Sequence, residues 1–558
     1  MKEIILGQIP DNFDPALHIP ISPACFVDHE WVYPKWMDIE FEPDPFQSAD
    51  LMAKHVEMTT RYCQNYMHKL STTLNDLNNT EYSEKYWSLL TLPWLLTLVQ
   101  TTWERQLRLD HFLKNYSDQP AKVVLVRNNV DWDFSDTLSH QQKGVLRHEY
   151  NHWLYSRLLE NRIPDKWIVS WTDINATEQR TSDRPVTFKQ RVQKTFADQI
   201  LASSVYGIDR FTALFYEVLL LKSLRFKKIS HQTINSENLP PINLDWSLDW
   251  DTLVLSTLPR CFMSVTGIKK DSSNWSRYYL VGPILWYNEN KKRKLAEALI
   301  NGSKLVVAQH GGSYGTSRFY SFKNAIEYNH HRFISWGWTE QGEHKDNTIP
   351  LPAPLLSRFT YKKSGKKVIL ITTRAMMYSY RISPIPQAAQ QLAYRESKAK
   401  FIEHLSDQVY SNLFYRPPLN ELGSISDRAY FEDRFKGLSL LEGNLHRETM
   451  RCRLLVLDHP DTTLNIALSA NVPTICFWDS KIWAMCEQAE PYFEELRAAG
   501  ILFENGQEAA IKVNEIWDDV TEWWNQSSIQ TARHNWVSQY ALKSRNWRWQ
   551  WIKALWNL

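Results

Sequence analysis

The sequence predicts an α/β fold with two Rossmann-like domains that face each other across a cleft, together with a helix-rich N-terminal region. Three observations favour this fold. After about Leu255, strand-like runs alternate with helical ones, which is typical of βαβ units with a parallel sheet. A proline-rich, helix-poor stretch from Thr348 to Lys367 then indicates an interdomain linker. A second α/β series begins directly after it.

The first part of the chain has a mainly helical texture from about Asp50 to Leu221. Residues 84–116 carry leucines at helical spacing and then a charged face, which predicts a long helix. Two further helical blocks cover residues 140–163 and 190–226. The compact apolar run at 122–128 is strand-like.

The two α/β series define the predicted domains. In the first, strand-like runs lie at 278–287, 304–309 and 333–338, and a charged helix lies at 288–301. In the second, strand-like runs lie at 367–373, 411–417, 453–460, 471–479 and 500–506, which suits one Rossmann-like domain. The predicted boundaries are 1–347 for an acceptor-side domain, 348–367 for the linker, 368–530 for a nucleotide-donor domain, and 531–558 for a Trp-rich helix that crosses back.

Two sheets joined by a linker, with a terminal helix that returns across them, outline the GT-B architecture. In that architecture the reaction takes place between the carboxyl ends of the two sheets, where Rossmann-like domains generally bind ligands.

Composition excludes several classes of partner. With 64 Lys+Arg against 62 Asp+Glu, the net charge of +2 gives no reason to expect nucleic acid. The 6 cysteines are scattered, without the spacing of a zinc site, and reduced thiols are expected. The 25 Trp, 25 Tyr and 23 Phe are compatible with a carbohydrate enzyme, although most of them are expected in the core.

No secretion signal or membrane span is expected. The N-terminal apolar patch is interrupted at Pro10, and the apolar run from Leu89 to Val99 is far shorter than the ~20 residues that cross a bilayer. A cytoplasmic location is therefore predicted, and the inner face of the membrane is the alternative. In the last helix, tryptophans alternate with Arg545, Arg548 and Lys553, which leaves open packing against the domains or peripheral membrane contact.

The first candidate site is the strand-like run that begins at Lys304 and ends in Gln309-His310-Gly311-Gly312. A histidine at the carboxyl end of a buried parallel strand can accept a proton or hold a phosphate. Two glycines allow close approach to backbone N–H groups. A plain strand-to-turn junction with a core histidine is the alternative.

Glu327 lies downstream of this run, where it could orient the His310 imidazole or act as the base itself. A solvated helix carboxylate is the alternative interpretation. The adjacent His330 and His331 do not have the spacing of metal ligands on one helix.

The second candidate site follows the strand at 454–457. Asp458 ends this strand, and Thr462 and Thr463 open a helix whose N-terminus could bind a donor phosphate. Arg416, at the end of the preceding strand, could add a positive charge to the same phosphates. An ordinary helix cap and a surface arginine are the alternatives.

Motifs of other enzyme classes are weak or missing. Asp131-Trp-Asp133 and Asp249-Trp-Asp251 read as DxD, but the second pair precedes its apolar run instead of following it, so no metal is expected. Walker, G-x-G-x-x-G and G-x-S-x-G motifs do not occur, which argues against kinases, NTPases, NAD enzymes and serine hydrolases.

The motifs "AQHGGSYG", "FISWGW", "LDHPDTTLNIALSANVPTICFWD" and "YFEELRAAGILF" together resemble a family of transferases found among bacterial surface-carbohydrate and O-antigen biosynthesis proteins. The C-terminal half is more distantly similar to capsule, teichoic-acid and ulosonic-acid transferases. Related transferases often show histidine-proline where this chain has Pro417-Pro418, and an acid where it has His331.

The resemblance implies a GT-B-like, metal-independent glycosyltransferase without a cofactor. The donor would be a nucleotide-activated sugar, such as a CMP-ulosonic acid or NDP-sugar, and the acceptor a surface glycan, lipid-linked glycan or glycoprotein. His310 and Glu327 would be catalytic. The implied substrate-binding residues are Gln309, Gly311, Gly312, Tyr314, Arg416, Asp458, Thr462 and Thr463. A CDP-polyol phosphotransferase, a nucleotide-sugar epimerase and a non-catalytic carbohydrate-binding protein remain alternatives.

Overall fold

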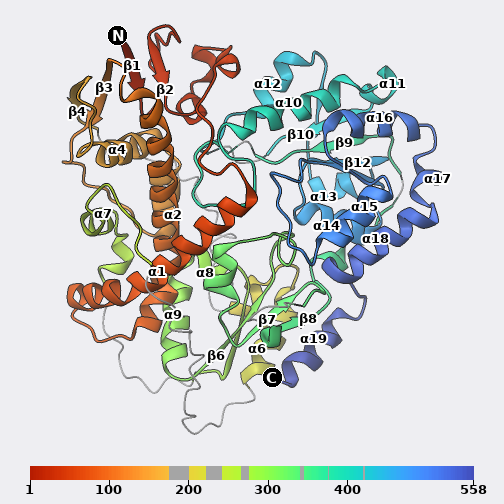
Figure 1. Ribbon diagram of the computed structural model, residues 1–558. Coiled ribbons are helices and arrows are strands. Elements are labelled where there is room, and N and C mark those ends of the chain that lie inside the picture. Colours follow the sequence, from red (N-terminus) through yellow and green to blue (C-terminus); the bar gives the residue numbers. More distant parts are fainter. Residues whose placement is uncertain are drawn as a thin grey trace.

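The described part of the chain forms three separate, wholly parallel sheets with helices around them (Figure 1). The computed structural model describes residues 1–174, 200–221, 242–265, 275–339, 345–362, 364–374, 376–418 and 422–558. The α/β class predicted from the sequence is confirmed, but three sheets stand where two were expected.

The third, unexpected sheet lies in the N-terminal part and has the order β2-β1-β3-β4. Its strands are β1 (Lys2–Ile5), β2 (His18–Pro20), β3 (Ala121–Val126) and β4 (Trp167–Thr172). Only β3 was predicted. Strands β1 and β2 are very short, and β4 is largely exposed at the sheet edge, so none of them shows a clear apolar pattern.

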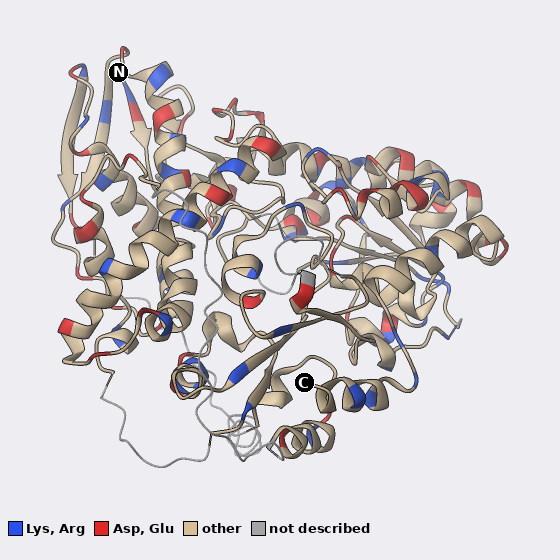
Figure 2. Ribbon diagram, turned by 60° about the horizontal axis from the view of Figure 1, so that its bottom comes forward, with Lys and Arg blue, Asp and Glu red and all other residues tan. Residues whose placement is uncertain are grey.

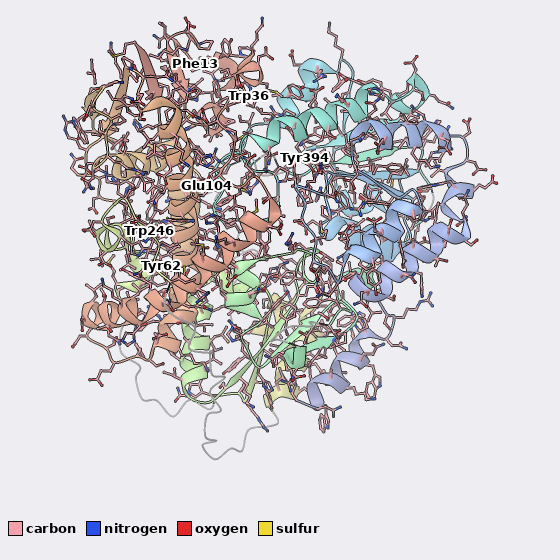
Figure 3. The ribbon with its side chains drawn as sticks, in the orientation of Figure 1. Phe13, Trp36, Tyr62, Glu104, Trp246 and Tyr394 are labelled. Atoms are coloured by element: carbon pink, nitrogen blue, oxygen red, sulfur yellow. The ribbon has the colours of Figure 1, made fainter. Side chains whose placement is uncertain are left out.

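Helix α4 (His148–Leu159) packs against β3 of this sheet, α2 (Glu84–Tyr116) packs against α4, and α1 (Ala49–Asn78) packs against α2. The short α3 (Thr137–Ser139) and α7 (Trp250–Ser256) lie beside them. Helix α2 confirms the predicted long helix; it runs through Pro93 and is buried on all sides along its middle. Tyr62 of α1 and Trp246 lie together, and the Trp246 indole donates to the Tyr62 hydroxyl at 3.1 Å (Figure 3).

The second sheet has the order β5-β6-β7-β8. Its elements are β5 (Tyr278–Val281), α8 (Ile284–Tyr287), α9 (Glu289–Ile300), β6 (Lys304–Ala308), β7 (Arg332–Ser335) and β8 (Thr348–Pro350). The charged helix and the predicted strands at 304–309 and 333–338 are confirmed, whereas of the predicted run 278–287 only the first half is a strand and the second half forms α8. Strand β8 occupies the start of segment 348–367, where no strand was predicted.

The C-terminal sheet has six strands in the order β11-β10-β9-β12-β13-β14. Numbered along this part of the chain, the order is that of the dinucleotide-binding Rossmann fold, and it reverses between β9 and β12. The strands are β9 (Val368–Ile371), β10 (Leu413–Arg416), β11 (Ser439–Leu440), β12 (Leu454–Leu457), β13 (Thr474–Phe477) and β14 (Leu502–Phe503). The five predicted strands are confirmed, and β11 was missed.

Helices cover both faces of this sheet (Figure 1). Helix α10 packs with α16, whereas α14 and α15 pack with α18. The helices are α10 (Gln390–Glu403), α11 (Asp407–Tyr410), α12 (Asp427–Arg434), α13 (Leu445–Thr449), α14 (Thr462–Ala470), α15 (Glu490–Ala498), α16 (Gly506–Ile516), α17 (Val520–Trp524) and α18 (Ser527–Tyr540).

The end of the chain returns to the second sheet. After α18, the Leu542 backbone N–H donates to the Trp336 carbonyl oxygen at 2.8 Å. Helix α19 (Trp547–Trp556) then packs against α6 (Arg210–Leu221), and the Trp551 indole donates to the Pro352 carbonyl oxygen at 2.9 Å. The rest of the predicted helical block 190–226 lies largely outside the described residues.

A buried ionic network joins the N-terminal helices to the C-terminal domain. Glu104 of α2, labelled in Figure 3, pairs with Arg105 and Arg108, and Arg108 also pairs with Asp44. The second Asp44 oxygen accepts the N–H of Gln390, at the start of α10, at 3.1 Å. Elsewhere acidic and basic residues are interspersed along the ribbon (Figure 2). Among the described helices, none is both long and apolar enough to cross a bilayer.

Candidate functional site

Gln309 follows strand β6 and fastens the loop that comes after it. Its side-chain oxygen accepts hydrogen bonds from the Trp336 backbone N–H and the Trp338 indole N–H, both at 2.8 Å. Its side-chain nitrogen donates to the Gly311 carbonyl oxygen at 2.8 Å. Gln309 is buried, so its amide supports the loop from behind and links the Gln-His-Gly-Gly and Trp-Gly-Trp motifs.

His310, Tyr314 and Glu327 form one hydrogen-bonded cluster. His310 Nε2 lies 2.8 Å from Glu327 Oε1 and 2.6 Å from the Tyr314 hydroxyl. The same hydroxyl donates to Glu327 Oε2 at 2.6 Å, and the Trp286 indole donates to Oε1 at 2.8 Å. The fully buried Glu327 carboxylate therefore receives three donors, from strand end, loop and α8. Charge-assisted bonds of this kind stabilise a buried carboxylate.

These contacts fix the roles of the two imidazole nitrogens. Burial and then the Glu327 charge raise the pKa of Tyr314 well above its ordinary value, so its hydroxyl stays a donor. Because that proton goes to Glu327, His310 Nε2 carries the ring proton and Nδ1 is the acceptor. Glu327 would stabilise the imidazolium that forms when Nδ1 takes up a proton, which is the arrangement of a general base with its orienting carboxylate.

The loop after β6 touches the C-terminal domain directly. The Gly312 backbone N–H donates to Thr462 Oγ1 at 3.0 Å and to Asp461 Oδ1 at 3.2 Å. Asp461 also caps α14 by accepting the Thr462 N–H at 2.7 Å. The Gly312 amide and the Thr462 hydroxyl, both predicted to face a ligand, thus bond to each other. Gly311 makes no such close approach.

The other predicted residues lie at the carboxyl edge of the C-terminal sheet. The buried Asp458 accepts the Thr373 N–H at 2.8 Å, which bridges the ends of β12 and β9 at the point where the strand order reverses. Arg416 ends β10, and its Nη1 donates a hydrogen bond to the Leu441 carbonyl oxygen at 2.7 Å. Within the described part of the chain, the Thr463 N–H and hydroxyl have no hydrogen-bond partner, so they stay open to a ligand.

A comparison with family models gives one match, described as LIC12162 family transferase and covering residues 2–555. The chain belongs to this family of transferases. The match extends over nearly the whole chain, so all three sheets are part of the family's common sequence. Among curated proteins, none matches the chain.

His459 is a residue of this LIC12162 family transferase that the sequence analysis quoted without assigning a role. Its Nδ1 lies 2.6 Å from Asp458 Oδ1. Burial favours the neutral ring, but the hydrogen bond and charge of Asp458 raise the pKa of His459 above its ordinary value. A histidine directly after a strand-end aspartate is the signal that could have marked it.

Three of the four carboxylates in the DxD pairs have structural partners in this transferase. Asp133 pairs with Arg260 at 2.7 Å. Asp249 caps α7 by accepting the Thr252 N–H, and Asp251 accepts the Tyr66 hydroxyl at 2.8 Å. Each of these three carboxylates therefore has a structural role that requires no bound ligand.

Lys323 is a buried cation beside the His310 cluster that was also missed. It begins the π-helical turn Lys323–Glu327, and its ammonium donates to the Ser313 hydroxyl at 3.1 Å. The ammonium lies 4.1 Å from the centre of the Tyr314 ring. Burial lowers the pKa of Lys323 to about 7, against the opposing charges of Asp461 and Glu327. Nothing in the local sequence distinguishes this lysine from a surface one.

Lys323→Met is expected to raise the stability of this transferase at and below pH 7. The unfolded chain holds the lysine proton up to about pH 10.5, whereas the folded chain releases it near pH 7. Wild-type stability therefore rises with pH between these values, and the cost of the buried cation is fully present below pH 7. The substitution should add on the order of 1–3 kcal/mol there and flatten the pH dependence. Urea unfolding from pH 6 to 10 checks this, and a destabilised variant at pH 6 would contradict it.

Proposed function

We propose that the chain is a GT-B-like glycosyltransferase that moves a sugar from a nucleotide-activated donor to a surface-glycan, lipid-linked or glycoprotein acceptor. One observation carries the proposal: His310, which is paired with Glu327, lies on the loop that contacts the start of α14, beside the Rossmann-type reversal between β9 and β12. Ligands of such sheets bind outside the carboxyl ends of the strands at the reversal.

In this proposal the donor nucleotide lies against the C-terminal sheet, with Thr463 and Arg416 near its phosphates. His310 Nδ1 accepts the proton of the acceptor hydroxyl while the acceptor oxygen bonds to the anomeric carbon. The bond from that carbon to the phosphate oxygen breaks, and the electron pair leaves with the nucleotide. Fixed cations and helix N–H groups stabilise the leaving charge without a metal. The structural contacts of Asp133, Asp249 and Asp251 support the metal-free route.

A thermal-shift screen with CMP, CDP, UDP and GDP tests the donor class. We expect one nucleotide to raise the Tm of the wild-type protein, and the corresponding nucleotide sugar to be consumed only when an acceptor is present. Consumption without an acceptor would indicate an epimerase instead. Transfer of a phosphodiester, detected by mass spectrometry of the product, would indicate a polyol phosphotransferase. No shift with any nucleotide would overturn the proposal.

The acceptor side is proposed to contact a membrane through a surface made by α6 and α19. Of the tryptophans in α19, Trp547 and Trp551 pack inward, whereas Trp549 and Trp556 are 68% and 66% exposed. Phe211 of α6 is 87% exposed on the same surface, and a groove of about 510 Å³ lies between the two helices. Exposed aromatic residues flanked by Lys553 and Arg545 suit an interface with anionic lipid.

A full-length variant with Trp549→Ala and Trp556→Ala is expected to lose co-sedimentation with vesicles of anionic phospholipid. Trp31→Ala is the matched control, because Trp31 is 67% exposed but belongs to the N-terminal part of the chain. We expect the double variant to bind at least about tenfold less than the control, since each buried aromatic side chain contributes a few kcal/mol. Equal binding by both variants would exclude this surface.

A further inference from the structure

Arg381 carries a guanidinium group that donates no hydrogen bond to any described residue. It lies in the long loop between β9 and α10, close to the His310 cluster. Its Nε and Nη1 atoms are enclosed by protein and have no partner in the described part of the chain. A guanidinium offers five N–H donors in a rigid fork and stays charged at neutral pH. Burial lowers the pKa of Arg381 to about 10, which leaves the charge in place.

Aromatic rings hold this guanidinium and leave its donors unused. Its central carbon lies 4.3 Å from the centre of the Tyr320 ring, 4.9 Å from Tyr380, 5.5 Å from Trp286 and 5.8 Å from Phe322. Cation–π contacts attract the charge to the ring faces but accept no N–H bond within the guanidinium plane. The arginine is thus fixed in position, while its Nε and Nη1 groups keep their hydrogen atoms available to a ligand.

The backbone on both sides of Arg381 is fixed by α2. Arg105 Nη2 donates to the Ser379 carbonyl oxygen at 3.0 Å, and Gln100 Oε1 accepts the Ile382 N–H at 3.1 Å. Gln100 also donates to the Ser321 hydroxyl at 2.8 Å, which ties the arginine loop to the segment after β6. A binding group that is held by side chains of a rigid helix loses little freedom when it binds a ligand.

A second basic side chain, Lys323, lies beside Arg381. The Lys323 ammonium lies 4.4 Å from the centre of the same Tyr320 ring. Among the described residues, neither Lys323 nor Arg381 forms an ion pair, and the nearby Glu327 is occupied by its three donors. The Trp286 ring, which Arg381 contacts, lies 5.4 Å from the His310 ring. A negative group that bonded to Arg381 would therefore sit beside the proposed base.

We propose that Arg381 binds an oxyanion of the substrate beside His310: phosphate oxygens of the activated donor or the carboxylate of an acidic sugar. The inference rests on the proposed function and assigns to this arginine the principal charge contact that Arg416 was expected to supply. Both kinds of oxyanion accept two parallel bonds from the guanidinium fork, which a lysine cannot offer. Bound oxygens would complete the hydrogen bonds of Nε and Nη1.

Anion binding to Arg381→Met, Arg381→Lys and the wild type tests this inference. The probes are inorganic pyrophosphate and N-acetylneuraminate, followed by thermal shift and titration calorimetry. Arg434→Met is the control, because Arg434 also lies over a tyrosine ring, but its donors go to Glu396 and Glu403. We expect one probe to stabilise the wild type and the control, with an apparent Kd about 10- to 100-fold weaker in Arg381→Met. Arg381→Lys should lie between them.

The probe that binds names the source of the oxyanion, pyrophosphate for a donor phosphate and N-acetylneuraminate for a sugar carboxylate. Without a probe, Arg381→Met should melt at or above the wild-type Tm, since it removes an unpaired buried cation. Equal binding by the wild type and Arg381→Met, or no binding of either probe to the wild type, would overturn the inference. The nucleotide thermal-shift screen distinguishes a failure of the Arg381 inference from a failure of the proposed function. A nucleotide that raises the Tm of the wild type would still support the proposed function even if neither probe bound at Arg381.

Discussion

His310→Ala is expected to lower kcat of the transferase by about a hundred- to ten-thousandfold, the usual contribution of a general base. The substitution removes the Nδ1 acceptor, while Glu327 keeps its bonds from Trp286 and Tyr314. The proposed donor contacts lie at the C-terminal sheet, so the KM for the donor should change little. Initial rates with the donor class selected by the nucleotide screen provide the measurement.

Glu327→Gln is likewise expected to lower kcat of the transferase. Glutamine keeps the shape of the side chain but loses the charge that would stabilise the His310 imidazolium, so kcat should fall with a small change in KM. The exposed Glu515→Gln, on α16, is the matched control and should have wild-type rates. Wild-type kcat in His310→Ala would exclude histidine as the base, and full activity of Glu327→Gln would exclude the carboxylate's role.

The sequence predicted most strands of the second sheet and of the C-terminal sheet, because most of these strands are buried and read as continuous apolar runs. Strand β12, Leu454–Leu457, is completely buried and was found directly. The N-terminal sheet was missed for the opposite reason. Strand β1 has four residues and is exposed at its start, so the pattern that identifies a strand hardly exists in it.

In the candidate site, the residues close together in the sequence could be predicted as partners, whereas contacts between distant segments could not. A histidine at a strand end and a carboxylate 17 positions later could be predicted as partners, and they do form a hydrogen bond. Arg381 could not be found, since its significance comes from rings contributed by two other segments, α8 and the stretch after β6, and from the side chains of α2 that fix its loop. Likewise, its position at a helix N-terminus predicted Thr462 as a phosphate ligand. The sequence could not show that the Thr462 hydroxyl already accepts the Gly312 N–H and that Asp461 already accepts the Thr462 N–H.

Gly312→Ala is expected to separate the loop after β6 from the C-terminal domain. A Cβ atom at this position would lie 2.3 Å from the Asp461 carbonyl carbon and 2.3 Å from the Thr462 backbone nitrogen. Both atoms belong to the backbone at the start of α14, so no side-chain rotation can relieve the clash. The free energy of unfolding should fall by about 1–3 kcal/mol, the usual cost of overpacking, and transfer should fall with it.

Gly311→Ala is the matched control for this variant. A Cβ atom there would meet the Tyr314 ring at 3.5 Å and Thr462 Oγ1 at 3.8 Å, which are ordinary contacts. Urea unfolding and initial rates of both variants make the comparison, and equal effects would contradict a specific requirement for glycine at 312. If only Gly312→Ala is impaired, the glycine pair serves mainly to let two sheets meet. The His310–Glu327 pair would then depend on that contact for its distance from whatever binds at α14.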